Sequence, residues 1–210
     1  MAELRLVMLA GGGHARVLID ALEHSGVYVS VILDPAIGVG QQVFGIPVVG
    51  DEDWLATVST SEFSLVNGLG AQPRSTLRQS IFDRFRQSGF RFTTVVHSTA
   101  IIGRNVELLE GAQVMAGVIV QCSTRIGANA IINTGARIDH DCEIADHAFV
   151  GPGVILCGSV RVGTHAYIGA GAVVLPGTVI GAGAVIGAGA IVTRDVNDKA
   201  LVIGNPGMQK

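Results

Sequence analysis

Apolar residues in the second half of the chain recur with a strict period of six. Every sixth residue from Val96 to Val192 is Ile, Val or Leu, and the residue four places after each, from Ala100 to Val196, is Ala, Val, Thr or Cys. One large and one small apolar residue per hexad is typical of a triangular parallel β-helix. Each hexad then forms one side of a prism and three form a coil, so residues 18 apart lie above one another.

The chain before this repeat alternates between predicted strands and helices. It begins with a short buried apolar run, which passes through glycines into residues at helical spacing. This order predicts a small parallel α/β sheet. The expected elements are a strand over 4–9, a helix from the glycines at 11–13 to Gly26, strands over 27–33 and 63–67, and a helix over about 73–87. We therefore predict a Rossmann-like α/β domain over 1–95, a β-helix over 96–197 and a C-terminal tail over 198–210.

Composition and charge exclude several classes of function. The formal net charge is −3, and the arginines form no run, so we expect no nucleic-acid partner. No stretch reaches the roughly 18–20 unbroken apolar residues of a membrane span. The N-terminus lacks the basic and apolar regions of a signal peptide. We therefore expect a soluble, cytoplasmic protein.

The three cysteines do not form a recognisable framework. Cys122, Cys142 and Cys157 have no CxxC spacing and fall at three different positions of the repeat. This pattern argues against a disulfide scaffold or a zinc knuckle. Cys142 lies in the small inward register, so we expect a buried thiol there.

The glycines at 11–13 separate the first strand from the first helix, and Asp34 follows the second strand. Backbone amides at such a helix start favour a phosphate, and an acid at the next strand tip can bind a ribose or a base. Arg16 occupies the place of the last glycine in the dinucleotide fingerprint, so glycines serving chain geometry alone, and Asp34 serving the turn alone, remain open alternatives. A ligand at the carboxyl ends of the strands would lie near 11–14, Asp34 and 68–70.

Of the histidines in the repeat, His140 carries the strongest chemical signal. It lies between Asp139 and Asp141, and a carboxylate beside an imidazole fixes its tautomer and stabilises its conjugate acid, as a general base requires. A surface histidine in a polar turn is the alternative. His147 and His165 are 18 residues apart and should stack above Asn129. A metal site there would need His140, which the repeat puts on another face, so no metal is expected.

The segment 132–142, Ile-Asn-Thr-Gly-Ala-Arg-Ile-Asp-His-Asp-Cys, resembles the active-site segment of bacterial nucleotide-amino-sugar N-acetyltransferases of the bacillosamine and perosamine pathways, and of the related sialic acid O-acetyltransferases. Further matching segments are 12–14, Asp34, 96–100 and 202–206. The resemblance covers nearly the whole chain. It implies a left-handed β-helix and a homotrimer with active sites between subunits.

The resemblance also implies roles for individual residues. His140 would be the general base and Asp141 the acid that orients it. Acetyl-CoA, the co-substrate, would lie along the β-helix, and its activated thioester requires neither a metal nor a covalent intermediate. The implied substrate-binding residues are Gly12, Gly13, His14, Asp34 and Asn133, and the implied cofactor-binding residues are His147, Phe149, Gly158, Ala188, Gly204, Asn205 and Pro206.

At several positions the sequence departs from the family pattern. Phe149 stands where the family commonly has a second histidine, so either His147 takes part of that role or the contact to the acyl donor is apolar. Ala10, Ala15 and Ala188 stand where relatives often carry glycine. These departures concern the phosphate and cofactor contacts and leave the base unaffected.

We therefore predict an acetyl-CoA-dependent N-acetyltransferase acting on the 4-amino group of a nucleotide-linked 4-amino-4,6-dideoxy sugar. O-acetylation of a sialic acid or similar sugar is an alternative, because it uses the same base. A non-catalytic trimeric scaffold that binds a nucleotide sugar is an alternative of another class. The sequence does not distinguish a UDP-linked from a GDP-linked sugar.

Overall fold

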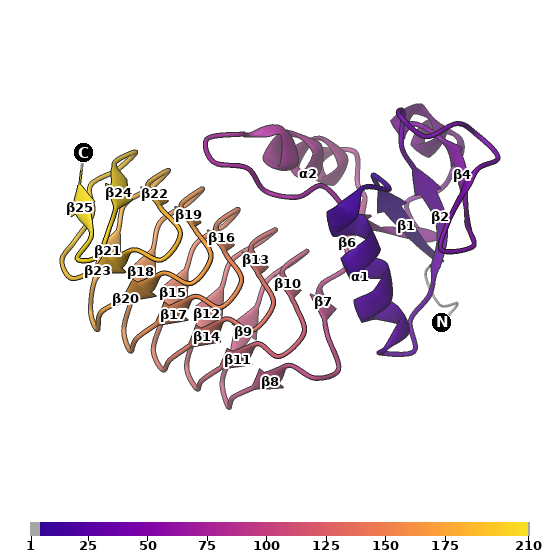
Figure 1. Cartoon of the computed structure of the whole chain (residues 1–210). Coiled ribbons are helices and arrows are strands. Elements are labelled where there is room, and N and C mark those ends of the chain that lie inside the picture. The colour runs from indigo at the N-terminus through magenta and orange to yellow at the C-terminus, as the bar shows by residue number, and fades with distance from the viewer. Residues whose placement is uncertain (1–4, 210) are drawn as a thin grey trace. The chain divides into compact units, whose positions relative to one another are not determined.

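The protein, seen in a computed structural model that describes residues 5–209, divides into two compact units. The N-terminal unit comprises residues up to 70 together with 76–95, and the β-helix unit comprises 71–75 and the chain from 96 onward. Figure 1 shows the α/β elements of the first and the stacked coils of the second. The predicted architecture, an α/β domain followed by a β-helix, is confirmed.

The N-terminal unit is built on a six-stranded sheet in the order β3-β4-β2-β1-β5-β6. All neighbouring pairs are parallel except β3 and β4. The central strand β1 lies between β2 and β5, so the chain leaves it first towards one edge of the sheet and later towards the other. The strands are β1 (Arg5–Leu9), β2 (Val29–Leu33), β3 (Gln42–Val43), β4 (Ile46–Gly50), β5 (Phe63–Asn67) and β6 (Arg91–Phe92).

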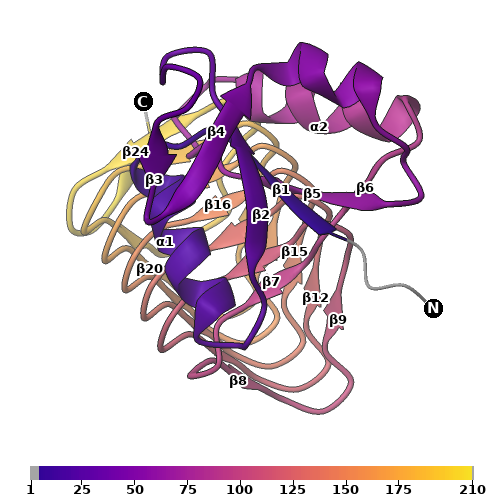
Figure 2. The same ribbon diagram turned by 90° about the vertical axis from the view of Figure 1, so that its right-hand side faces the viewer.

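Two helices cross between parallel strands of this sheet (Figure 2): α1 (Gly13–Glu23) joins β1 to β2, and α2 (Leu77–Gln87) joins β5 to β6. Each buries one apolar face, with Leu18 and Leu22 on α1 and Ile81 and Phe85 on α2. A 3₁₀ helix, η1 (Glu52–Thr57), precedes β5. Neither α-helix is long and apolar enough to cross a membrane, among the residues that the structure describes.

Some boundaries differ from the sequence prediction. The second helix begins at Leu77 rather than near residue 73, because Arg74 has φ +64°, a left-handed conformation that a helix cannot contain. The second strand begins at Val29, the first of its residues to pair with β1, and Val27 and Tyr28 before it are exposed. Residue 4, where the first strand was predicted to begin, lies outside the described residues. The hairpin β3-β4 was not predicted; positive φ at both Phe44 and Gly45 gives the turn that joins its strands.

The β-helix unit consists of two-residue strands, apart from the three-residue β24, and these form three sheets, which we call the first, second and third faces. All pairs in them are parallel except β24 and β25. The first face contains β7 (Val95–Val96), β10 (Gln113–Val114), β13 (Ile131–Ile132), β16 (Phe149–Val150), β19 (Tyr167–Ile168), β22 (Val185–Ile186), β24 (Leu201–Ile203) and β25 (Met208–Gln209). The second contains β8 (Ile101–Ile102), β11 (Ile119–Val120), β14 (Arg137–Ile138), β17 (Ile155–Leu156), β20 (Val173–Val174) and β23 (Ile191–Val192). The third contains β9 (Glu107–Leu108), β12 (Arg125–Ile126), β15 (Glu143–Ile144), β18 (Arg161–Val162) and β21 (Val179–Ile180).

The pairing confirms the predicted register of 18 residues up to Val192, whereas the last coil is two residues shorter, with Ile180 paired to Val196 and Ile186 to Val202. Ile132 pairs with Val150 on the first face, and Ile138 pairs with Leu156 on the second. The large residue of each hexad points into the prism, and those of the central coils are fully buried. Left-handed φ angles occur at the corners, at Asn129 and Asp141 among others, where the chain turns from one face to the next.

The N-terminal unit contains one close approach that only glycine permits. A Cβ on Gly68, just after β5, would lie 2.4 Å from the backbone oxygen of Leu9 and 2.8 Å from the Cβ of Ala15. A Cβ on Gly70 would meet only ordinary contacts, the nearest being His14 Cβ at 3.5 Å. Gly68 therefore lets the end of β5 pack directly against β1 and the start of α1.

We predict that Gly68→Ala destabilises the N-terminal unit by about 1–3 kcal/mol, because the added methyl group overpacks a contact with the backbone. At a urea dependence of about 1–3 kcal/mol per molar, this lowers the midpoint by roughly 1 M. The only tryptophan, Trp54 of η1, packs edge-on to Phe63 at 5.5 Å, so its fluorescence reports on this unit. Gly70→Ala is the matched control. Equal midpoints for the two variants would contradict the prediction.

Candidate active site

The glycine turn of the N-terminal unit is tied to the tip of β2 by Asp34. One carboxylate oxygen of Asp34 accepts the N–H of Gly11 at 2.7 Å, and the other accepts the N–H of Ala36 at 2.8 Å. The second bond is turn chemistry at Asp34 itself, while the first fixes the glycine turn beside the second strand tip. Asp34 thus has a structural role whether or not it also binds a ligand.

The next residues of this turn face open space. A Cβ at either Gly12 or Gly13 would meet no atom within 4 Å, and Gly12 is the N-cap of α1. His14 follows in the first turn of α1, in contact range of Gly70. The residues predicted near a ligand in this unit therefore lie together at the carboxyl ends of β1, β2 and β5.

A buried arginine that the sequence analysis did not identify holds the loop after β5, at the same edge of the sheet. Arg78 of α2 donates from Nη1 to the backbone oxygens of Asn67 at 2.8 Å and Leu69 at 2.6 Å. Burial lowers the pKa of Arg78 to about 9. The side chain of Asn67 in turn donates to the backbone oxygen of Arg78 at 3.1 Å. These bonds hold the loop after β5, and nothing in the polar pattern of α2 distinguishes Arg78 from its surface arginines.

In the β-helix unit, His140 and Asp141 form a dyad at the corner between the second and third faces. His140 Nδ1 lies 2.7 Å from Asp141 Oδ2, and both side chains are more than half exposed. With Nδ1 donating to the carboxylate, Nε2 presents its lone pair to solvent. The backbone N–H of His140 donates to Asp139 Oδ1 at 2.8 Å. Asp139 thus bonds to the backbone of His140, and Asp141 bonds to its imidazole.

Gly158 lies one coil beyond His140 and is buried beneath its ring. A Cβ on Gly158 would lie 2.7 Å from both Cε1 and Nε2 of His140, so the imidazole rests on this glycine. The predicted stacking is confirmed. A side chain at 158 would displace the ring, and glycine leaves the backbone of residue 158 next to the reactive nitrogen.

Charge around His140 favours its protonated form. The hydrogen bond that His140 donates to Asp141 raises the pKa of His140 above its ordinary 6.5, and the charge of Asp139 raises it further. A raised pKa makes the neutral imidazole a stronger base, but the neutral form is lost as the pH falls through that pKa. A reaction that uses this base would therefore slow at acidic pH.

The other predicted residues of this unit lie at different corners. Asn133 follows β13 at the corner between the first and second faces, where its Oδ1 accepts the N–H of Thr134 at 2.8 Å. Ala188 is exposed at the same corner, farther along the helix. Gly204, Asn205 and Pro206 are exposed in the turn between β24 and β25. Within one chain, these residues and His140 occupy opposite edges of the second face.

His147 and Phe149 take part in stacks of their own. The His147 and His165 rings are stacked with centroids 5.0 Å apart, and Asn129 Nδ2 lies 3.0 Å from His147 Nδ1, as the register predicted. Phe149 is buried on the first face and stacks on Tyr167 at 4.5 Å. Neither residue is on the corner that carries His140.

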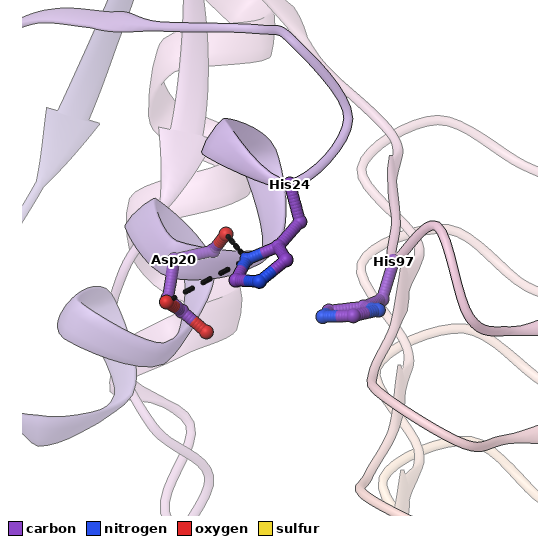
Figure 3. A group of neighbouring side chains, drawn as sticks. All are labelled: Asp20, His24 and His97. Atoms are coloured by element: carbon purple, nitrogen blue, oxygen red, sulfur yellow. Dashed lines mark hydrogen bonds and ion pairs between the residues drawn. The ribbon is translucent and has the colours of Figure 1, made fainter.

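Two further histidines are His24, on α1, and His97, which follows β7 at the corner between the first and second faces (Figure 3). His24 on α1 has its Nδ1 2.8 Å from the backbone oxygen of Asp20, one helical turn earlier. In the β-helix unit, His97 Nδ1 accepts the N–H of Thr99 at 3.1 Å. Each of these bonds is local, to a residue within four positions along the chain.

The three faces differ in their outward side chains. The second face presents Ile101, Ile119, Ile155, Val173 and Ile191, with Arg137 the one charged residue between them. Ile101 is 61% exposed and Ile155 36%. The third face instead presents alternating charges, with ion pairs Arg125–Glu107 at 3.6 Å and Arg161–Glu143 at 3.9 Å. The apolar strip therefore lies between the edge with His140 and the edge with Asn133.

Family models match the N-terminal unit and the β-helix unit separately. The PglD N-terminal domain model matches residues 5–85, and the bacterial transferase hexapeptide model matches 123–158, 141–176 and 159–194. PerB from Caulobacter crescentus, crystallised with CoA and GDP-perosamine, is 40% identical, with coverage of 100% of this chain and 98% of that one and a TM-score of 0.90.

Two other solved structures cover almost all of the chain. The acetyltransferase domain of PglB from Neisseria gonorrhoeae, crystallised with acetyl coenzyme A, is 30% identical over 100% of both chains, with a TM-score of 0.92. WeeI from Acinetobacter baumannii is 22% identical, covers 99% of this chain and 100% of that one, and has a TM-score of 0.88. At that identity WeeI shows a shared fold only.

We predict that Asp141→Asn lowers the pKa of His140 more than Asp139→Asn does, because the hydrogen bond donated to Asp141 is the larger cause of the raised value. Titration of the Cε1–H resonance of His140 by NMR, assigned by its absence in His140→Asn, measures both shifts. An unchanged titration in Asp141→Asn would contradict the geometry of the dyad.

Proposed function

The chain belongs to the nucleotide-amino-sugar N-acetyltransferases that join a PglD N-terminal domain to a hexapeptide β-helix, and on that premise we propose its substrate and the roles of its residues. It is an acetyl-CoA-dependent acetyltransferase. The proposed acceptor is the 4-amino group of a nucleotide-linked 4-amino-4,6-dideoxy sugar. The exposed His140–Asp141 dyad carries the proposal, because it provides a positioned base with Nε2 turned to solvent.

The reaction follows from the chemistry of an amine and a thioester. The neutral amine attacks the thioester carbonyl, a C–N bond forms, and the C–S bond breaks as CoA leaves. The amine gives up a proton to His140 Nε2, while Asp141 stabilises the imidazolium that results. The backbone amide of Gly158, beneath the ring, is the proposed donor to the oxyanion that develops on the carbonyl.

The nucleotide is proposed to bind the N-terminal unit at the carboxyl ends of its strands. The open backbone of Gly12 and Gly13 at the N-terminus of α1 suits a phosphate, with His14 beside it. The topology supports this place, because the chain leaves β1 in two directions and such a switch point is where parallel sheets bind ligands. Since the relative crystallised with GDP-perosamine is 40% identical, we favour a GDP-linked sugar over a UDP-linked one.

A homotrimer built on the second face is the proposed assembly. An apolar strip that is partly exposed marks an interface, and this strip is interrupted by charge only at Arg137. In a closed ring, one edge of the face meets the opposite edge on the neighbouring copy. The edge with His140 and Gly158 would then lie beside the neighbour's edge with Asn133 and Ala188, which completes an active site between subunits. The contacts of acetyl-CoA to His147, Phe149 and the 204–206 turn remain part of this proposal.

His140→Asn is predicted to lower turnover by roughly 10²–10⁴-fold while the protein keeps its mass in solution, because the base is lost and the fold is not. The assay is thiol release from acetyl-CoA with GDP- and UDP-linked amino sugars and free sialic acid. His24→Asn, an exposed histidine on α1, is the matched control. Release with sialic acid alone would favour O-acetylation. If none of the sugars stimulates thiol release, the result would instead favour a non-catalytic scaffold that binds a nucleotide sugar.

Ile155→Glu is predicted to break the trimer into smaller species, because it places a carboxylate in the middle of the apolar strip. Val179→Glu is the matched control, since Val179 is 38% exposed and Ile155 36%, but Val179 lies on the third face. Light scattering after size exclusion measures both masses. Dissociation of Val179→Glu with an intact Ile155→Glu would place the interface on the other face.

A further inference from the structure

The turn that carries the proposed base is closed by a buried hydroxyl from the preceding coil. Thr124 is 1% exposed and points into the prism. Its Oγ1 donates to the backbone oxygen of Asp139 at 3.1 Å and accepts the N–H of Cys142 at 3.3 Å. These two groups are the ends of the four-residue turn that contains His140 and Asp141. The Thr124 side chain, which belongs to the preceding coil, thus connects the two ends of the turn that carries His140.

The neighbouring corners are closed in a different way. At the corner before, the N–H of Ala136 donates directly to the oxygen of Asn133 at 3.1 Å. At the corner after, the N–H of Ala148 donates to the oxygen of Ala145 at 3.4 Å. At the His140 corner the Thr124 hydroxyl bonds to both of the corresponding groups.

The geometry of the dyad depends on the shape of this turn. His140 and Asp141 are adjacent in sequence, and Asp141 has φ +59°, so their side chains meet only while the backbone between them keeps this conformation. Bonds to both neighbouring coils support it: the N–H of Asp141 donates to Cys122 O at 3.1 Å, and the N–H of Ser159 donates to His140 O at 2.9 Å. The Thr124 hydroxyl fixes the distance between the two ends of the turn, the backbone oxygen of Asp139 and the N–H of Cys142.

A related bond occurs one coil later. Cys142 is at the same inward position as Thr124, and its Sγ donates to the backbone oxygen of Cys157 at 3.2 Å. That carbonyl belongs to the peptide group of Gly158, on which the His140 ring rests. Two successive polar residues of the inner column therefore bond to the backbone of the two turns that form the proposed active site.

The alternative, that Thr124 only fills space, does not account for its chemistry. Val106 and Val160 occupy the same inward column one coil before and two coils after, so valine has the right shape for it. A buried hydroxyl costs free energy unless it is hydrogen-bonded, and Thr124 uses its hydroxyl as both donor and acceptor.

We propose that Thr124 is a positioning residue of the acetyltransferase, whose buried hydroxyl holds the His140–Asp141 turn in its catalytic shape. The proposal rests on the proposed role of His140. Removal of the hydroxyl lets the ends of the turn move together or leaves both unsatisfied, and either result displaces the imidazole. A misplacement of about 1 Å can cost about 10²-fold in rate.

The test compares Thr124→Val with Thr124→Ser and with Thr178→Val, a buried threonine in the same inward column three coils later. We expect Thr124→Val to lower kcat about 10–100-fold with the KM for acetyl-CoA changed less than about threefold. It should also move the NMR-measured pKa of His140 towards its ordinary value. Thr124→Ser should restore kcat and the pKa, and Thr178→Val should leave both as in the wild type.

Wild-type kcat and His140 titration in Thr124→Val would overturn the proposal, as would an equal loss in Thr178→Val. Thr124→Ala, with the commonest residue of this register, replaces the valine variant if the latter does not assemble, and failure of both to assemble would also overturn it. If the wild-type protein releases no thiol with any amino sugar, the proposed function fails, while the His140 titration still decides whether Thr124 holds the turn.

Discussion

The backbone hydrogen bonds between successive coils are the constraint on which the β-helix unit depends. The N–H of Asn133 donates to Val150 O at 2.9 Å and that of Asp139 to Leu156 O at 2.9 Å, and the same offset recurs along each face up to the last coil. Because the paired strand residues lie 18 positions apart as far as Val174 and Val192, adding or removing a residue within these strands would shift the side chains that follow. The last coil is two residues shorter, since Ile180 pairs with Val196 and Ile186 with Val202. Columns of residues, rather than neighbours in sequence, are therefore the units that carry packing and chemistry.

This constraint explains why glycine and small residues are so frequent. A Cβ at Gly127 would lie 2.4 Å from the backbone nitrogen of Asp146 in the next coil, and one at Gly163 would lie 2.6 Å from that of Ala182. The coils are too close for a side chain at these positions. The same closeness brings His140 onto Gly158, so a tight structural contact also brings a backbone amide next to the proposed base.

The sequence predicted the β-helix unit well because its signal is local and repeated. A large residue every six positions determines the register, and the register alone gave the stacking of His147 on His165 and of His140 on Gly158. The N-terminal unit was predicted less completely. Its third strand was correct at Phe63–Asn67, but the hairpin β3-β4 depends on a two-residue turn with positive φ at Phe44, a residue type that gives no turn signal.

The sequence predicted those site residues whose type and neighbours indicate chemistry, and missed those that act through the backbone. His140 is conspicuous between two aspartates, whereas Thr124 and Arg78 act through backbone carbonyls brought near by folding, 15 and about 10 residues away along the chain. In the hexad pattern, threonine at an inward position counts as one more small residue, equivalent to alanine or valine. Its meaning depends on what lies above it in the next coil. A residue of the inner column can therefore affect catalysis without interrupting the hexad pattern, because a single buried hydroxyl changes the hydrogen bonds of one corner and leaves the repeat intact.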